Sequence, residues 1–269
     1  MPEGDTVYAL ARRLDTALRN RVLTHGELRV PAHATADLAG LTVLENLTHG
    51  KHLLTRLSSD LTLHTHLLMS GSWTVSNTGR WLPNAVMPDV RVVLRTDNPA
   101  AYGVKIPIVE LLRTRDESDV IGHLGPDPLR DDWDIAEATR RIREDPDRPL
   151  AAVLLDQRCV AGFGNLWANE LCFLRGHSPW TPVAAVDVTA LLELGARALR
   201  HSATVPGAMQ VTTGTRRKGE QHWVAGRAGR PCLRCGTTVR VVAEVAGDPE
   251  RRRTWWCPNC QPGPAGPPA

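Results

Sequence analysis

The chain has 269 residues, enough for one large domain or for two small domains and an additional module. Its hydrophobic content of 42% and charged content of 23% are normal for a soluble globular protein, and no apolar run reaches the roughly eighteen residues of a transmembrane helix. The net charge is only +3, but residues 216–269 hold ten Lys or Arg against four Asp or Glu. This basic segment indicates an anionic partner, most often nucleic acid, with a solvated positive surface as the alternative.

The start of the chain and its cysteines indicate the compartment. Glu3 and Asp5 occur early and no long apolar core follows them, which argues against a signal peptide. Four of the six cysteines form two Cys-x-x-Cys pairs, a usage that fits a reducing compartment and one metal site better than a disulfide framework. We therefore expect a cytoplasmic protein without membrane association.

The first residues of the chain offer a nucleophile. Removal of Met1 would leave Pro2 with a free secondary amine, and an α-amino group with a reference pKa of roughly 8 is partly neutral at cellular pH. Attack of this amine on an aldehyde-like carbon gives an iminium ion, an electron sink suited to elimination at the neighbouring carbon. Glu3 supplies an adjacent carboxylate. The alternative is that Pro2 merely begins the chain before a helix.

The next hundred residues predict one helix followed by β-structure. Residues 6–20 carry apolar side chains at helical spacing, and Asp5 is a candidate cap for this helix. Several short β-rich segments with turn residues between them then predict a sandwich or barrel. The expected strands are residues 21–24, 41–44, 52–57, 61–67, 90–95 and 104–109.

Three features of this β-region have more than one interpretation. Lys51 begins a strand and is a phosphate contact, a catalytic amine or a solvated charge. His64 and His66 share one strand face, but two His without a third ligand are usually structural. Met69, in the turn after that strand, either packs in the core or is an exposed apolar wedge of the type that enters the space left by an extruded base.

A Gly- and Pro-rich linker at residues 122–128 separates this region from a helical one. Helices are predicted at residues 133–144, 149–157, 166–175 and 187–202. The turn containing Gly162 and Gly164 can present backbone N–H groups to a phosphate. Asn165 follows this turn, where it caps the helix, binds a phosphate, or does both.

The two cysteine pairs lie near the end of the chain, separated by 21 residues. Cys232, Cys235, Cys257 and Cys260 are typical of one tetrahedral structural Zn²⁺ site, and the span between the pairs suits a β-hairpin that depends on the metal to fold. The hairpin tip is expected near residues 247–249, which would bring several Arg close to it as a phosphate fork.

Taken together, these motifs resemble the formamidopyrimidine-DNA glycosylase and endonuclease VIII family of bifunctional base-excision enzymes. The start of the chain is most similar to the endonuclease VIII side, in particular its actinobacterial branch. The matching segments are residues 1–4, 50–53, 66–71, 162–170 and 226–229, with Arg252 five residues ahead of Cys257.

The resemblance implies an α+β fold in four parts. These are an N-terminal helix plus β-sandwich catalytic domain at residues 1–122, a helix-two-turns-helix DNA-binding domain at residues 127–215, a zinc-finger β-hairpin at residues 216–262 and a disordered tail at residues 263–269. It also implies a bacterial, nucleoid-associated monomer that acts on damaged double- or single-stranded DNA in base excision repair.

The resemblance further implies a mechanism and roles for individual residues. Pro2 would attack C1′ of the damaged nucleotide, Glu3 would shuttle protons and Lys51 would serve catalysis and phosphate binding, so that base loss is followed by β,δ-elimination. No organic cofactor or catalytic metal is implied. The residues that would contact DNA are Met69 in the gap left by the flipped base, Asn165 and Arg252 on phosphates, and Tyr102 as a further wedge.

Two departures from the formamidopyrimidine branch bear on the lesion. That branch has a carboxylate where this chain has Thr6, and it has an Arg in a loop that corresponds to residues 99–103 here, where Arg is absent. The resemblance therefore favours oxidised pyrimidines, abasic sites or single-stranded substrates over 8-oxoguanine. The alternative function is a non-catalytic, zinc-dependent DNA-binding protein derived from the same family.

Overall fold

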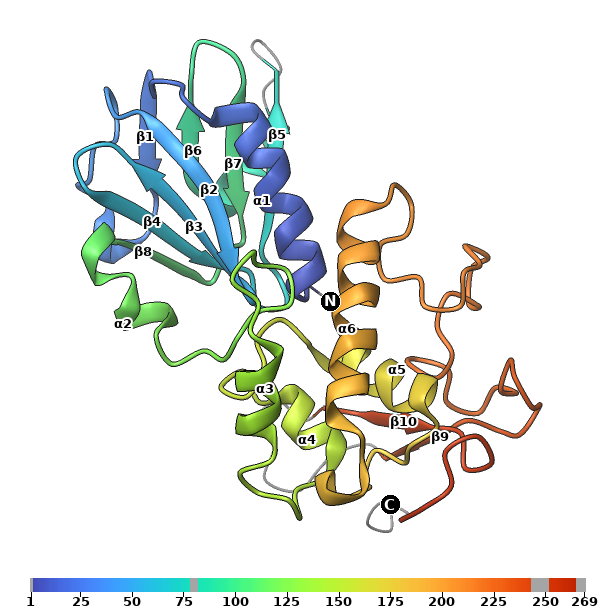
Figure 1. The fold of residues 1–269 in the computed structure, drawn as a ribbon. Helices are drawn as coiled ribbons and strands as arrows, with labels where there is room; N and C mark the ends of the chain where they lie inside the picture. The colour runs from blue at the N-terminus through green and yellow to red at the C-terminus, as the bar shows by residue number, and fades with distance from the viewer. Residues whose placement is uncertain (1, 78–81, 243–251, 265–269) are drawn as a thin grey trace. The chain divides into compact units, whose positions relative to one another are not determined.

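Figure 1 shows the computed structural model of the protein, which describes residues 2–77, 82–242 and 252–264. The chain forms two compact units. Unit 1 contains Pro2 and residues 6–123, and unit 2 contains residues 3–5 and the chain from Leu124 onward. The expected hairpin tip at residues 247–249 and most of the expected C-terminal tail lie outside the described residues.

Unit 1 holds two antiparallel four-stranded sheets. The first has the order β1 (His25–Leu28), β6 (Val90–Arg95), β7 (Ala100–Val104) and β5 (Ser72–Ser76). The second has the order β2 (Val43–His49), β3 (His52–Leu57), β4 (Leu61–His66) and β8 (Ile108–Arg113). The shorter helical elements of this unit are η1 (Pro31–His33), η2 (Met87–Asp89), η3 (Thr114–Asp116) and α2 (Ser118–Ile121).

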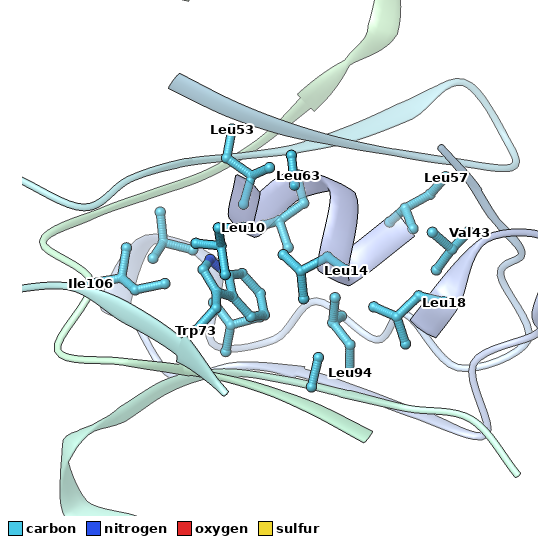
Figure 2. Close-up of a cluster of buried hydrophobic side chains, with 14 of the residues drawn as sticks. Leu10, Leu14, Leu18, Val43, Leu53, Leu57, Leu63, Trp73, Leu94 and Ile106 are labelled. Atoms are coloured by element: carbon cyan, nitrogen blue, oxygen red, sulfur yellow. The ribbon is translucent and has the colours of Figure 1, made fainter. Parts of the chain in front are cut away.

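Helix α1 (Gly4–Leu18) supplies one stripe of the apolar core of unit 1. Figure 2 shows Leu14 and Leu18 of α1 among side chains of both sheets, including Leu63 from β4 and Leu94 from β6. Burial of this stripe stabilises the helix against the strands, because apolar area removed from water is the main favourable term in folding. The predicted amphipathic helix and β-sandwich are thus confirmed, whereas the helix begins at Gly4, before the predicted Thr6.

Two of the predicted strands are wrong in position. The expected strand at residues 104–109 is split between the end of β7 and the start of β8, because Lys105 has a left-handed backbone with φ of 52° and Pro107 has no N–H for a ladder hydrogen bond. The expected strand at residues 21–24 is reduced to an isolated bridge between Val22 and Thr42, and β1 follows it.

The regular secondary structure of unit 2 is mainly helical. Its helices are α3 (Ile135–Ile142), α4 (Leu150–Leu155), η4 (Val183–Ala185), α5 (Asn165–Arg175) and α6 (Val188–Thr204). Asp134 and Asp187 cap α3 and α6 by accepting the N–H of Glu137 and Ala190 at 2.9 and 3.1 Å. The strands β9 (Arg240–Val242) and β10 (Thr254–Trp256) form the predicted antiparallel hairpin. Among the described helices, none is both long and apolar enough to cross a membrane.

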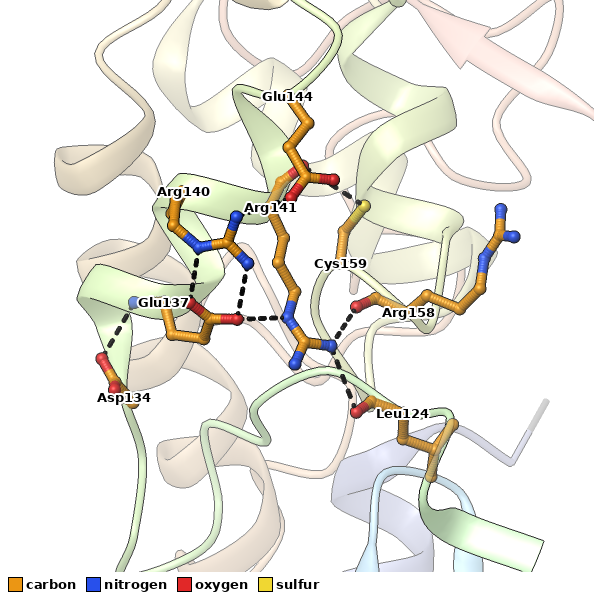
Figure 3. Close-up of polar contacts among 8 residues, drawn as sticks. All are labelled: Leu124, Asp134, Glu137, Arg140, Arg141, Glu144, Arg158 and Cys159. Atoms are coloured by element: carbon orange, nitrogen blue, oxygen red, sulfur yellow. Dashed lines mark hydrogen bonds and ion pairs between the residues drawn. The ribbon is translucent and has the colours of Figure 1, made fainter. Parts of the chain in front are cut away.

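The segment between α4 and α5 is held to α3 by polar contacts, as Figure 3 shows. Arg141 donates from Nε to Glu137 at 2.7 Å and from Nη1 to the carbonyl oxygens of Arg158 and Leu124 at 2.9 and 3.4 Å. Gln157 adds a hydrogen bond of 2.8 Å to the carbonyl oxygen of Phe163. These bonds define the backbone path of the turn that leads into α5.

The core contact of α1 predicts a large effect of truncation. Leu14 is fully buried, so Leu14→Ala is expected to lower the free energy of unfolding by about 3 kcal/mol through lost transfer energy and a cavity. The neighbouring Arg13→Ala, on the exposed face of the same helix, should change it by less than about 0.5 kcal/mol. Urea denaturation of both variants measures the difference, and equal midpoints would contradict this assignment of the core face.

Candidate functional site

The carboxylate of Glu3 binds the N-terminus of helix α5. Glu3 is fully buried, and its side chain accepts hydrogen bonds from the backbone N–H of Gly164 at 2.9 Å, Leu166 at 2.7 Å and Trp167 at 3.3 Å. An anion is stabilised at this position because the first N–H groups of a helix have no partner within the helix and the helix dipole is positive there. The residue that follows Pro2 is therefore fixed to α5 within unit 2.

Three glycines allow this approach of the two segments. The N–H of Gly4 donates to the carbonyl oxygen of Gly162 at 2.9 Å, and a Cβ atom on Gly4 would lie 2.8 Å from the Cα of Gly162. Gly162 also has a φ of 96°, which L-residues rarely adopt. A Cβ on Gly164 would lie 2.4 Å from Cδ of Glu3. The turn predicted to receive a phosphate thus receives the carboxylate of the protein's own Glu3.

Asp5 has a role that differs from the predicted one. It lies inside α1 and does not cap it, and its buried carboxylate accepts hydrogen bonds from Nε1 of Trp167 at 3.0 Å and from Oγ of Ser202 at 2.6 Å. Asp5 therefore links the start of the chain to α5 and α6. No local pattern in the sequence could reveal this role, because both partners lie more than 160 residues away.

Helix α5 presents further polar side chains to the C-terminal part of unit 2. Asn169 accepts the backbone N–H of Trp255 at 2.8 Å, which ties α5 to the hairpin. Glu170 is fully buried and accepts the backbone N–H of Trp223, Val224 and Ala225, each at 2.9 Å. These contacts satisfy buried groups that would otherwise destabilise the fold, and they position residues 223–225.

Asn165 is the first residue of α5, but it is not the cap. Gly164 occupies the cap position, and the Asn165 side chain donates to the carbonyl oxygen of Arg253 at 2.9 Å. Only 7% of Asn165 is exposed. Arg252 is half-buried and directly precedes Arg253. The structure therefore brings Asn165 beside the strand segment that carries Arg252, within unit 2.

The four cysteines form one cluster. The Sγ atoms of Cys232, Cys235, Cys257 and Cys260 lie within 4.8 Å of one another, which is a geometry that could hold a metal ion. Cys232, Cys257 and Cys260 pack with the buried side chains of Phe173, Val224 and Val239. The predicted cluster is confirmed as a possible metal site.

In unit 1, Lys51 lies in a two-residue turn between β2 and β3. Gly50 occupies the other turn position with a φ of 58°, and His49 and His52 are paired on either side of the turn. Two-residue turns of this kind need a left-handed backbone, which Gly adopts at little cost. Lys51 is half-buried in this turn.

A network of histidines lies beside Lys51, and no local sequence pattern predicts it. Nδ1 of His52 lies 2.9 Å from Nε2 of His64, and Nδ1 of His64 lies 2.7 Å from the Glu110 carboxylate. The rings of His66 and His123 pack edge-on to His52 at 4.7 and 6.2 Å between centroids. The pairing of β3 with β4 and of β4 with β8 brings these residues together. Their spacing along the sequence does not predict this pairing.

Met69 and Tyr102 have opposite environments. Met69 is 70% exposed in the turn after β4, so the interpretation as core packing is wrong. Tyr102 lies on β7, is only 2% exposed and packs with Val90 and Val93. A side chain so buried within a sheet does not present a surface wedge, so the assignment of Tyr102 as a DNA contact is corrected.

Known proteins match both units of the chain. The family model for the formamidopyrimidine-DNA glycosylase N-terminal domain matches residues 1–106, and the model for the H2TH domain of the same glycosylase matches residues 124–200. A probable endonuclease 8 2 of Streptomyces coelicolor is 49% identical, covering 98% of this chain and 95% of its own. The DNA-(apurinic or apyrimidinic site) lyase Nei2 of Mycolicibacterium smegmatis is 42% identical, covering 97% and 99%.

A solved structure shows the same fold. A complex of the Lactococcus lactis Fpg with DNA containing an abasic site superposes with a TM-score of 0.78 at 21% identity, covering 97% of this chain and 100% of that one. The predicted α+β fold, with helix-two-turns-helix and cysteine hairpin, is thereby confirmed.

The histidine network predicts a pH dependence of stability. Burial, and then the neighbouring His66, His64, His123 and His49, lower the pKa of His52 to about 2. In the unfolded chain His52 would titrate near 6.5, so the unfolded state binds more protons below that pH. The contribution of His52 to stability is complete above about pH 7 and is lost as the pH falls below 6.5, by roughly 1–2 kcal/mol at pH 5.

His52→Gln should remove this part of the pH dependence, since glutamine does not titrate. Urea denaturation of the wild type and the variant at pH 7.5 and pH 5 measures the difference. An identical loss of stability in both proteins on acidification would contradict the assignment to His52.

Proposed function

Because the chain belongs to the formamidopyrimidine-DNA glycosylase and endonuclease VIII family, we propose that it removes oxidised bases from DNA and cuts the strand at the resulting abasic site. The activities are those of a DNA glycosylase and of a DNA-(apurinic or apyrimidinic site) lyase, in DNA repair. The observation that carries the proposal is the anchoring of Glu3 on α5, because it holds in place the residue bonded to the nucleophile Pro2.

The proposed reaction begins at the free amine of Pro2. Its nitrogen forms a bond to C1′ of the damaged nucleotide, the glycosidic bond breaks, and the base leaves with a proton delivered through Glu3. Opening of the sugar ring gives an iminium ion, which acidifies the C2′ proton, and loss of that proton expels the 3′ phosphate. Loss of a further proton then expels the 5′ phosphate, so that β- and δ-elimination cut the strand on both sides. The base must leave the stack for this attack to occur.

The remaining site residues are proposed as DNA contacts. Lys51 binds a phosphate near the lesion and assists catalysis, and its place in a tight turn fixes its backbone. Met69 fills the space left by the extruded base, a role supported by its exposure of 70%. Asn165 and Arg252 bind phosphates, and the hydrogen bond from Asn165 to the carbonyl oxygen of Arg253 supports a joint role.

We place oxidised pyrimidines and abasic sites ahead of 8-oxoguanine among the substrates. Thr6 stands where the formamidopyrimidine branch has a carboxylate. Residues 100–104 form strand β7 with Tyr102 buried, so Tyr102 is not presented on a loop to read the opposite base. The name of the Mycolicibacterium smegmatis relative, a DNA-(apurinic or apyrimidinic site) lyase, supports abasic sites as a substrate.

The proposed metal of the cysteine cluster is one structural Zn²⁺. Four sulfur atoms bound tetrahedrally at about 2.3 Å lie about 3.8 Å apart. The Sγ atoms of Cys232 and Cys260 are 3.9 Å apart, and those of Cys235 and Cys257 are 3.4 Å apart. Four thiolates without a carboxylate or an open position suit zinc in a structural role, where it would hold the hairpin that carries Arg252.

The iminium mechanism predicts a covalent adduct. Incubation with an abasic-site oligonucleotide and borohydride should reduce the iminium and trap a protein–DNA complex, visible as a shifted band on a denaturing gel. Pro2→Gly replaces the secondary amine with a primary one and should reduce strand cleavage by at least about tenfold. Wild-type cleavage by Pro2→Gly would refute the mechanism. No wild-type adduct, with metal and DNA binding intact, would instead favour the non-catalytic DNA-binding alternative.

The zinc proposal predicts a loss of metal on removal of one ligand. Cys257→Ala should lose its one equivalent of zinc by elemental analysis and should unfold the hairpin, because such a small module depends on its metal. Cys159→Ala removes a buried cysteine outside the cluster and should retain the metal. A full equivalent of zinc in Cys257→Ala would exclude this site.

A further inference from the structure

Arg227 is a buried cation without a counter-ion. Only 6% of it is exposed, and its guanidinium donates to two backbone carbonyl oxygens, those of Gly219 and of Pro231, the latter at 2.8 Å. Its Nε has no hydrogen-bond partner, and no carboxylate within the described ranges forms an ion pair with it. Arginine is rarely buried in this way unless an anion pairs with it, because the loss of hydration must be compensated.

A second guanidinium lies against the same glycine. Gly219 has a φ of 84°, and a Cβ atom placed on it would lie 2.6 Å from Nη1 of Arg230. The left-handed glycine therefore lets Arg230 approach the peptide whose carbonyl oxygen binds Arg227. Two like charges converge here, and no acidic residue in the described part of the chain forms an ion pair with either, which raises the local positive potential.

These groups line a cavity of about 450 Å³. Lys218, His222, Arg227 and Arg230 contribute side chains, together with Gln221 and three small residues, and none of the lining residues is acidic. The neighbouring Glu220 forms an ion pair with Arg217 at 3.6 Å. The cavity thus concentrates basic groups that have no ionic partner among the residues the structure describes.

The wall of the cavity is held in place by α5. Glu170 accepts the backbone N–H groups of residues 223–225, and Ala225 is itself a lining residue. The hydroxyl of Thr212 also donates to Glu170, and the Thr212 backbone N–H donates to the carbonyl oxygen of Gln221 at 2.9 Å. These hydrogen bonds fix the backbone that carries the basic groups, which lowers the conformational entropy lost when a ligand binds.

We propose that this cavity is a phosphate-binding site, in which Arg230 and Lys218 contact the phosphate and the buried Arg227 supplies the field that attracts it. The chemistry fits a phosphate because guanidinium forks bind its oxygens through paired, charge-assisted hydrogen bonds. Two sources share this chemistry, a phosphodiester of a DNA strand and free inorganic phosphate. The DNA source rests on the proposed function, whereas the free-phosphate source does not.

The test compares two substitutions that remove one positive charge each. Arg230→Gln removes a lining residue whose side chain is exposed, so folding should tolerate the substitution. Arg217→Gln is the control for loss of one positive charge, because Arg217 is exposed in the same segment, pairs with Glu220 and does not line the cavity. Zinc content and the urea midpoint of both variants verify that each protein is folded.

The first arm uses inorganic phosphate. Phosphorus NMR should show line broadening of phosphate by the wild type and by Arg217→Gln, and at least about tenfold weaker binding by Arg230→Gln. The second arm measures binding of a duplex with a non-cleavable abasic analogue, by fluorescence anisotropy at several salt concentrations. If a DNA phosphodiester occupies the site, Arg230→Gln lowers the salt-dependence exponent by about 0.9 relative to Arg217→Gln.

A selective effect of Arg230→Gln in either arm supports the site, and the arm identifies the source. Equal behaviour of the two variants in both arms overturns it. Failure of the Pro2 adduct together with a selective effect on free phosphate would refute the proposed function and leave the phosphate site standing.

Discussion

One carboxylate organises unit 2, the Glu3 side chain on the open N–H groups of α5. The contact is favourable because the first N–H groups of a helix lack partners within the helix and the helix dipole is positive at this end. The Glu3 side chain is fully buried there. It needs glycine at positions 4 and 164, where a Cβ atom would lie within 2.8 Å of a neighbouring atom, and at position 162, where φ is 96°. Glycine loses more backbone entropy on folding than other residues do, but larger residues would not permit this close approach.

Helix α5 connects the Glu3 contact to other parts of unit 2 through hydrogen bonds. Its first turn holds Glu3, Asn165 reaches the carbonyl oxygen of Arg253, and Asn169 takes the N–H of Trp255. One turn further, Glu170 fixes the backbone that walls the basic cavity. A helix of eleven residues thereby sets the position of the chain start, the cysteine hairpin and the basic cavity within unit 2.

Features with a local signature were predictable from sequence. The leucine spacing of α1 predicts its buried face. The two cysteine pairs predict a cluster that could hold a metal ion. Features that depend on distant partners were not. The place of Tyr102 in a sheet is one of these, because nothing near it in the sequence reveals that β7 is flanked by β5 and β6. The local sequence around Asp5 suggests a cap, because it does not reveal the partners Trp167 and Ser202. The series of polar contacts from Glu110 through His64 to His52 depends on strand register alone.

The Glu3 contact also constrains the order of events during synthesis. Glu3 leaves the ribosome first, yet the N–H groups that it needs lie 161 to 164 residues later. At roughly 5–20 residues per second, the start of the chain remains unanchored for on the order of ten seconds after it emerges. Closing so long a loop is entropically unfavourable until α5 has formed. The Glu3 contact therefore forms only after α5 has been synthesised, long after Glu3 itself.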